Sequence, residues 1–377
     1  MSEISIREVK TRRELRAFVD FPETLYRDNP HYVPYLAFDQ MDTLDPKTNP
    51  ASDFCKQALY LAYKDDKAVG RVAAIINERA NEQWKHKEVR FGWLDFIDDF
   101  EVAKALMDKV TEFGEKHSMD RIAGPLGFTD FDPEGMLVDG FDRDNTMPMI
   151  YNHPYYKTHI EALGFKKDVD WLEYRIFVPE KLPDKFERVA ELVRQREKLH
   201  TRHLTRRYIR KHNYGQKIFN LINDTYKNLY DFTVLPEDLA DKYLGFYLKV
   251  LDLDFVSMVE NEKDELVGFG ITMPSLADAL RKSRGKLFPF GWWHLAKSLF
   301  FKHEEGVDML LIGVRPDYQN RGINALIFTD LFPRFKSHNI KWAESSAILE
   351  SNVKSDAHWH YFDHECKKRR RSYFKHI

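Results

Sequence analysis

The chain has 377 residues, of which 43% are hydrophobic and 14% aromatic, and a formal net charge of −2 at pH 7. The length predicts two or three domains, and the apolar content excludes a disordered chain. The near-neutral charge indicates no general attraction to nucleic acid or membranes.

Two cysteines, Cys55 and Cys366, are too few for a disulfide framework or a cysteine-rich zinc site, and they fit a reducing compartment. Residues 1–30 contain no apolar leader, and no stretch approaches the roughly 20 apolar residues of a membrane span. The sequence therefore predicts a cytoplasmic protein without a transmembrane segment.

The first half of the chain has the pattern of one α/β unit. Two apolar runs, 58–63 and 68–77, flank the turn KDDK and predict a β-hairpin. The remaining predicted elements are strands at 4–9, 89–97, 121–128 and 169–178 and helices at 12–22, 101–117 and 154–163.

A helix that begins at Pro183 marks the boundary between the halves. Residues 196–212 are strongly basic, which fits either a solvated linker leading into a strand or an arm for nucleic acid. No aromatic platform interleaves these charges, as single-strand binders need, which favours the linker. We therefore predict units at 1–180 and 213–377, joined by a linker at 181–212.

The second half repeats the order of the first. Its hairpin at 255–273 resembles the earlier one in length, turn chemistry and the Val-Gly pair after the turn, which predicts two copies of one α/β unit. The other predicted elements are helices at 216–230, 236–250, 323–331 and 352–362 and strands at 307–314, 341–349 and 369–377.

The stretch VRPDYQNRGINALIF, residues 314–328, joins a buried strand to a helix through a polar turn. The first N–H groups of such a helix lack partners and carry the positive end of its dipole, so they can bind phosphate. Gly322 permits close backbone approach and Arg321 adds charge. An ordinary turn with a solvated arginine fits the pattern equally well.

This order of elements, with the Q-x-x-G turn, resembles the GNAT acyltransferase family and its bacterial tandem members. The resemblance implies an α/β fold with a mixed sheet, and a turn that binds the pyrophosphate of acetyl-CoA. It departs from the family pattern at Asn324, where Gly or Ala is usual. The implied cofactor-binding residues are Ile312, Gly313, Val314, Gln319, Asn320, Arg321, Gly322, Ile323, Asn324, Ala325 and Asn352.

The first half departs further from the family. Asp98, Asp99 and Glu101 occupy the place of a phosphate-binding turn, where they would satisfy the helix N-terminus and repel pyrophosphate. Residues 152–165 nevertheless resemble the last helix of the family. We therefore predict one CoA site per chain, in the second half.

The resemblance implies direct attack of a substrate amine on the thioester, with a base for the amine and an acid for the thiolate. Asp308, Glu344 and Glu350 are candidate bases, although each also fits a structural carboxylate. Tyr361 is the candidate acid, but family spacing from Asn352 falls on Trp359.

Other chemistry receives less support from the sequence. Cys366 is the one serious rival nucleophile for an acyl-enzyme, because His364 and Lys367 are near it in the sequence. His358 and His360 do not share a helix face, so no metal site is predicted. The amphipathic insert around Trp292 and Trp293 fits an interdomain seam, a lid or a membrane-surface contact.

We therefore predict an acetyl-CoA-dependent N-acyltransferase with an unidentified small-molecule amine acceptor and no nucleic-acid partner. An aminoacyl-tRNA-dependent transferase, with tRNA on residues 196–212, and a non-catalytic ligand-sensing protein remain alternatives. The intact Q-x-x-G turn and the near-neutral charge favour CoA.

Overall fold

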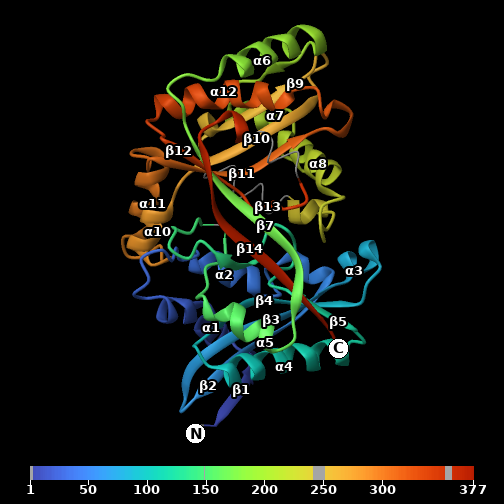
Figure 1. Ribbon diagram of the computed structural model, residues 1–377, viewed down its shortest axis with the longest axis vertical. Helices are drawn as coiled ribbons and strands as arrows, with labels where there is room; N and C mark the ends of the chain where they lie inside the picture. Colours follow the sequence, from blue (N-terminus) through green and yellow to red (C-terminus); the bar gives the residue numbers. More distant parts are fainter. Residues whose placement is uncertain (1–2, 148, 241–250, 353–358) are drawn as a thin grey trace.

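The computed structural model describes residues 3–147, 149–240, 251–352 and 359–377 (Figure 1). Their strands form one mixed sheet whose hydrogen-bonded order is β1-β2-β3-β4-β5-β14-β7-β12-β11-β10-β9-β8, with β6 beside β14 and β13 beside β7. Helices pack on this sheet, which confirms the α/β class.

The first half contains six strands before its terminal strand. The strands are β1 (Ile4–Glu8), β2 (Cys55–Lys64), β3 (Lys67–Asn77), β4 (Glu88–Phe96), β5 (Arg121–Gly124), β6 (Met136–Asp139) and the terminal β7 (Lys166–Phe177). The helices are α1 (Arg12–Leu25), α2 (Ala37–Leu44), η1 (Pro50–Asp53), α3 (Glu78–Trp84), α4 (Phe100–Lys116) and α5 (Tyr155–Ala162).

The second half repeats this arrangement with an insert. Its strands are β8 (His200–Thr201), β9 (Val256–Glu260), β10 (Leu266–Pro274), β11 (Gly306–Val314), β12 (Trp342–Ser345), β13 (Ile348–Leu349) and β14 (His364–His376). Its helices are α6 (Asp184–Glu197), α7 (Arg206–Lys211), α8 (Tyr214–Tyr226), η2 (Leu253–Phe255), α10 (Ala277–Ser283), α11 (Gly291–Phe300), η3 (Pro316–Tyr318), α12 (Ile323–Ser337) and η4 (Trp359–Tyr361).

The Val-Gly pairs of the two hairpins have the same structural role. A Cβ on Gly70 would lie 2.8 Å from Leu106 of α4, and a Cβ on Gly268 would lie 3.0 Å from Ile323 of α12. In each half, the missing side chain lets one helix pack closely on the central strands. The structure thus confirms the predicted repeat.

The two repeats nevertheless share strands. β14, the last strand of the chain, pairs with β5 of the first half and with β7, whereas β7 pairs with β12 of the second half. Figure 1 shows β7 and β14 crossing the middle of the molecule together. The predicted units 1–180 and 213–377 therefore do not form two separate sheets.

Two sequence predictions fall partly outside the described residues. Residues 241–250 of the predicted helix at 236–250 lie there, as do residues 353–358 of the predicted last helix. The described end of that second segment, Trp359–Tyr361, is a short 3-10 helix. The basic segment leads into the short strand β8, as the linker interpretation predicted, and then forms α7.

Candidate active site between the two halves

The strands β11 and β12 separate in the middle of the second half. They pair in parallel from Gly306 with Trp342 to Met309 with Ser345, and then diverge. Beyond that point the chain after β12 forms β13, which pairs with β7 instead. Among the described residues, the divergence leaves the second part of β11 without a paired strand on that side.

A cavity of about 320 Å³, here called the central cavity, lies at this divergence. Ligand pockets of proteins commonly measure roughly 300–1,000 Å³, so its volume suits a small molecule. Both halves of the chain line it. The lining residues are Asp130, Phe131, Asp132, Glu134, Met149 and Trp171 from the first half, and Ile218, Phe219, Ile222, Tyr226, Leu229, Tyr230, Phe232, Leu251, Ile271, Leu310, Leu311, Ile312, Ser346, Ala347, Ile348, Leu349 and Asn352 from the second.

The charged residue types on the wall of the central cavity are all acidic. Asp130, Asp132 and Glu134 come from the loop between β5 and β6, and no lysine, arginine or histidine belongs to the lining among the described residues. The backbone N–H of Thr233 donates a hydrogen bond of 2.9 Å to Asp130. Glu134 makes no hydrogen bond or ion pair with any residue that the structure describes.

Burial shifts the titration of this acidic group. It raises the pKa of Asp130 to about 7, against the opposing effects of the Thr233 N–H and the Arg90 guanidinium. Burial, followed by the negative charge of Asp130, raises the pKa of Glu134 well above its usual value. Carboxyl groups with pKa values near neutrality suit acid–base chemistry.

The predicted phosphate turn follows directly after β11. Gly322 has a left-handed backbone, with φ of 86°, and immediately precedes α12. The N–H groups of Asn320, Arg321 and Gly322 donate no hydrogen bond within the described part of the chain, and the side chains of Asn320 and Arg321 are exposed. The turn therefore offers unpaired donors beside the positive end of α12.

The helix α6 closes one side of this turn. A Cβ on Gly322 would lie 2.8 Å from Val189 of α6, and the Arg321 guanidinium is 2.7 Å from the Glu197 carboxylate. Sequence reasoning placed α6 in a linker and did not foresee this contact. Gly322 is needed for its left-handed backbone and for the room it leaves to α6.

The corresponding turn in the first half is blocked, as predicted. The Asp99 side chain accepts hydrogen bonds from the backbone N–H groups of Glu101 and Val102 at the start of α4. It also forms an ion pair with Lys64. The aspartate thus supplies the negative charge that a phosphate would bring.

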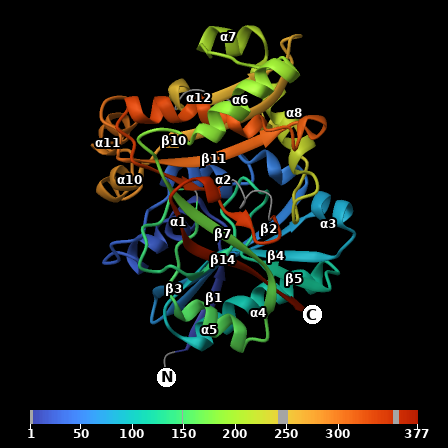
Figure 2. The ribbon, with the colours of Figure 1, turned by 45° about the horizontal axis from the view of Figure 1, so that its top comes forward.

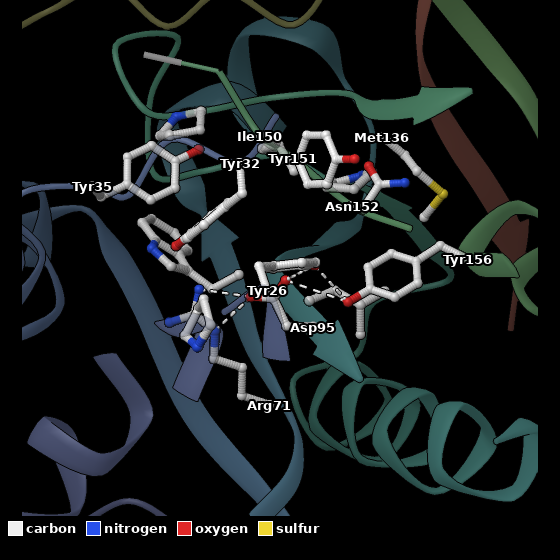
Figure 3. Close-up of a pocket in the computed structure, with 15 residues that line it drawn as sticks. Tyr26, Tyr32, Tyr35, Arg71, Asp95, Met136, Ile150, Tyr151, Asn152 and Tyr156 are labelled. Atoms are coloured by element: carbon white, nitrogen blue, oxygen red, sulfur yellow. Dashed lines mark hydrogen bonds and ion pairs between the residues drawn. The ribbon is translucent and has the colours of Figure 1, made fainter. Parts of the chain in front are cut away.

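The strands of the first half also diverge, but side chains fill the gap (Figure 3). β4 and β5 pair only as far as Arg90 with Ala123, and the pocket beyond measures about 30 Å³. That volume has room for only one or two water molecules. Asp95 is at its centre, where it accepts hydrogen bonds from Tyr26 (2.6 Å) and Arg71 (2.7 Å).

The structure places the predicted bases away from the central cavity. Glu344 is buried and accepts hydrogen bonds from Arg175 (2.8 Å) and Lys368 (2.9 Å), which fits a structural carboxylate. Glu350 is half-exposed and pairs with Lys167 and Arg369. Asp308 is buried with neither carboxylate oxygen hydrogen-bonded to a described residue.

The predicted acid is also remote from the cavity. Tyr361 is exposed, and its hydroxyl accepts a hydrogen bond from Lys185 of α6. Cys366 is exposed at the start of β14, and Cys55 is buried, where burial raises its pKa to about 12. Neither cysteine lines the central cavity. His358 lies outside the described residues.

Two groups of three possible metal ligands lie close together among the described residues, His86–Glu88–Asp231 and His200–Glu260–Asp264. Arginine side chains already pair with their carboxylates, Arg90 with Asp231 at 2.7 Å and Arg202 with Glu260 at 2.5 Å. Both groups therefore fit ion-pair networks.

Of the predicted cofactor residues, Ile312 and Asn352 line the central cavity, and Gly313 to Ala325 continue from it along β11 and the turn. The residues that sequence reasoning missed are Asp130 and Glu134. The segment FTDFDPEG has the pattern of an acidic, glycine-bearing loop, and nothing in that pattern distinguishes a buried acid from a solvated one.

Comparison with known proteins supports the fold. No family model matches the sequence. YghO of Escherichia coli K12 is 27% identical over 386 residues, covering 99% of this chain and 95% of that protein. A protein named bacterial ceramide synthase, from Caulobacter vibrioides, is 26% identical over 323 residues, covering 84% of this chain and 82% of that protein.

Two solved structures have the same architecture. A tandem GNAT protein from the clavulanic acid biosynthesis pathway aligns with a TM-score of 0.57 and 12% identity over 99% of this chain and 98% of its own. A GCN5-related glucosamine N-acetyltransferase region in a fungal multi-domain β-N-acetylglucosaminidase aligns with a TM-score of 0.57 and 13% identity, covering all of this chain and 38% of that one. This chain therefore has the tandem GNAT fold.

Proposed function

We propose that this protein is an acyl-CoA-dependent N-acyltransferase with one CoA site, in its second half. The observation that carries the proposal is the course of β11. Leu310 to Ile312 line the central cavity, and the same strand then leads to the turn with unpaired N–H groups before α12. One strand thus joins a place for a thioester to a place for a pyrophosphate.

The asymmetry between the halves supports a single site. The second half has a 320 Å³ cavity and an open turn, whereas the first has a 30 Å³ pocket and a turn capped by Asp99. Acetyl-CoA is the donor that the family resemblance implies, and the apolar wall of the cavity also suits longer acyl chains.

The name of one relative supports acylation of an amine. A ceramide is the amide of a long-chain amine with a fatty acid, and a protein named bacterial ceramide synthase is 26% identical to this chain. We extend from that name only the general reaction, N-acylation.

We propose direct transfer without an acyl-enzyme. The acceptor nitrogen attacks the thioester carbonyl, the C–S bond breaks, and CoA leaves as a thiolate that takes up a proton. A covalent route would need a nucleophile beside a base, and neither cysteine lines the central cavity. A Cys55→Ala, Cys366→Ala double variant should therefore keep most of its activity.

Calorimetry with CoA tests the location of the site. We expect a stoichiometry near one, and Arg321→Glu should weaken binding by about tenfold or more because it places negative charge beside the phosphates. Lys336→Glu, the same charge reversal at the other end of α12, is the matched control and should bind as the wild type does. Equal loss in both variants, or none in either, would place CoA elsewhere.

A further inference from the structure

We infer that the central cavity binds the acceptor as a primary amine on an apolar chain, with the amino group held by Asp130 and Glu134. The role in acyl transfer rests on the proposed function, whereas the binding of the amine does not. The loop between β5 and β6 of the first half would then supply the acceptor-binding groups of the second.

Charge complementarity selects the amine. The cavity wall carries three carboxyl groups and, among its described lining residues, no cation. A carboxylate ligand would therefore meet like charges, and an alcohol would leave the negative charge unpaired. An ammonium group can donate hydrogen bonds to both Asp130 and Glu134, and Glu134 has no competing partner among the described residues.

The remaining wall selects an apolar chain. Phe219 and Ile222 of α8, Trp171 of β7 and Leu310 of β11 are among the apolar residues that surround the cavity. Burial of each further methylene group strengthens binding by about fourfold, so a chain of several carbons would bind more tightly than a short polar amine.

The same carboxyl groups can take part in the reaction. With two neighbouring carboxyl groups in a low-dielectric site, one remains protonated while the other is ionised. The ionised group, which we assign to Asp130, first takes one proton from the ammonium, which leaves a neutral amine that can attack the thioester carbonyl. As the C–N bond forms and the C–S bond breaks, the second proton of the nitrogen passes through water to the thiolate.

Direct binding of n-decylamine to the full-length protein tests this site. Titration calorimetry should show binding to the wild type, weaker binding of methylamine, and none of decanoate. Glu134→Gln should weaken decylamine binding by about tenfold or more, with Asp130→Asn as a second variant. The exposed Asp142, on the loop after β6, provides the control Asp142→Asn, which should bind normally.

CoA affinity and thermal melting are measured on the same variants. Equal affinity for decylamine in wild type and Glu134→Gln, or tight binding of decanoate, would overturn the inference. If the wild type binds decylamine but does not bind CoA, the proposed function is overturned and the amine site remains supported.

We also infer, from a separate surface, that the insert between β10 and β11 docks on anionic lipid bilayers. Six exposed aromatic residues, here called the aromatic patch, gather on it: Phe288, Phe290, Trp292, Trp293, Phe300 and Phe301. Phe288 is 80% exposed and Phe301 is 73% exposed. Figures 1 and 2 both place α10 and α11 at the edge of the molecule.

The charges of the insert indicate its partner. Residues 275–305 contain six Lys or Arg, all between positions 281 and 302 around the aromatic patch, and three acids, Asp278, Glu304 and Glu305, towards the ends. Leu295 and Leu299 fix the inner face of α11 in the core, so the aromatic patch faces away from the protein. Exposed aromatic side chains with exposed lysines in the same segment suit the interface of an anionic membrane.

No helix among the described residues is long and apolar enough to cross a membrane. The tryptophans were expected at an interdomain seam, but they are about half exposed. The insert instead touches the first half through α10, where Gly285 accepts a hydrogen bond from the N–H of Ala37.

Vesicle flotation tests this second inference. The wild type should float with vesicles of phosphatidylcholine containing 30% phosphatidylglycerol, and much less with phosphatidylcholine alone or in 0.5 M salt. A Phe288→Ser, Phe301→Ser variant should lose most binding. The control Leu192→Ser removes an apolar side chain that is 64% exposed on α6, and this variant should bind vesicles as the wild type does.

Two results would overturn the membrane assignment. One is equal flotation of the Phe288→Ser, Phe301→Ser variant and the wild type. The other is absence of flotation together with a dimer in sedimentation velocity that this variant abolishes, which would assign the aromatic patch to a second copy of the chain.

Discussion

Carboxyl groups of the same type have different roles in this protein because their neighbours differ. Glu344 is buried between Arg175 and Lys368, which hold its charge in place. Glu134 lines a cavity and makes no hydrogen bond or ion pair with a described residue. The sequence shows Glu344 as a single acid in a predicted strand and Glu134 in an acidic loop, and neither pattern reveals the partners of the carboxylate. Only the tertiary contacts separate the structural carboxylate from the candidate ligand-binding one.

Asp308 provides a test at this scale. Burial, followed by the charge of Glu344, raises its pKa to about 8 in spite of Lys368, and Glu304 and Glu173 act in the same direction as Glu344. The pKa of this carboxyl group is about 8 in the folded protein and about 4 in the unfolded chain, so its contribution to the free energy of unfolding is fully present below about pH 4. This contribution decreases as the pH rises and is lost by the time the pH has passed about 8.

We therefore predict that Asp308→Asn flattens the dependence of stability on pH. Between pH 5 and 8 the wild type should lose up to about 1.4 kcal/mol per pH unit more than the variant in its free energy of unfolding. Urea unfolding at several pH values measures this. Parallel curves for the two proteins would show that Asp308 titrates normally.

Helices and strands were predicted from sequence patterns where the contacts that form them are close in the sequence. The first hairpin was predicted from the apolar runs on either side of KDDK, and its turn residues Asp65 and Asp66 have the left-handed φ values of 46° and 58° that suit a two-residue hairpin turn. The strand, turn and helix from 307 to 331 were also predicted. The packing of α6 on this turn was not, because it depends on a contact more than 120 residues away in sequence.

That contact gives a second prediction. Gly322→Ala should lower the free energy of unfolding by about 1 kcal/mol or more, because φ is 86° and the new Cβ would lie 2.8 Å from Val189. In a Val189→Ala background the loss should be smaller, since the clash is relieved and only the backbone strain remains. A double-mutant cycle by urea unfolding measures the difference, and an equal loss in both backgrounds would exclude the α6 contact as a cause.

At the scale of the whole molecule, the shared strands join the halves. β14 completes the first half and β7 pairs with the second, so each half would lose sheet partners if they separated. Periodicity in the sequence predicted both strands but could not indicate their partners, because pairing between distant strands leaves no local pattern. The same limit explains why a cavity built by both halves was missed.

The shared strands predict that the chain stays together when it is cut. A protease site inserted between Glu180 and Lys181, in the exposed connection after β7, should be cleaved completely while the fragments co-elute from a sizing column under native conditions. They should separate only in denaturant. Fragments that elute apart without denaturant would contradict the exchange of β7 and β14.

We propose N-acyl transfer from CoA to an amine that is bound in the central cavity. The most direct measurement follows thiol release from acyl-CoA donors of increasing chain length, with and without n-decylamine, and identifies the product by mass spectrometry. We predict thiol release that depends on the amine and equals the amide formed, and that falls at least tenfold in Arg321→Glu and in Glu134→Gln but not in Lys336→Glu. Binding of both CoA and the amine without any amide, across all donor lengths, would contradict the account.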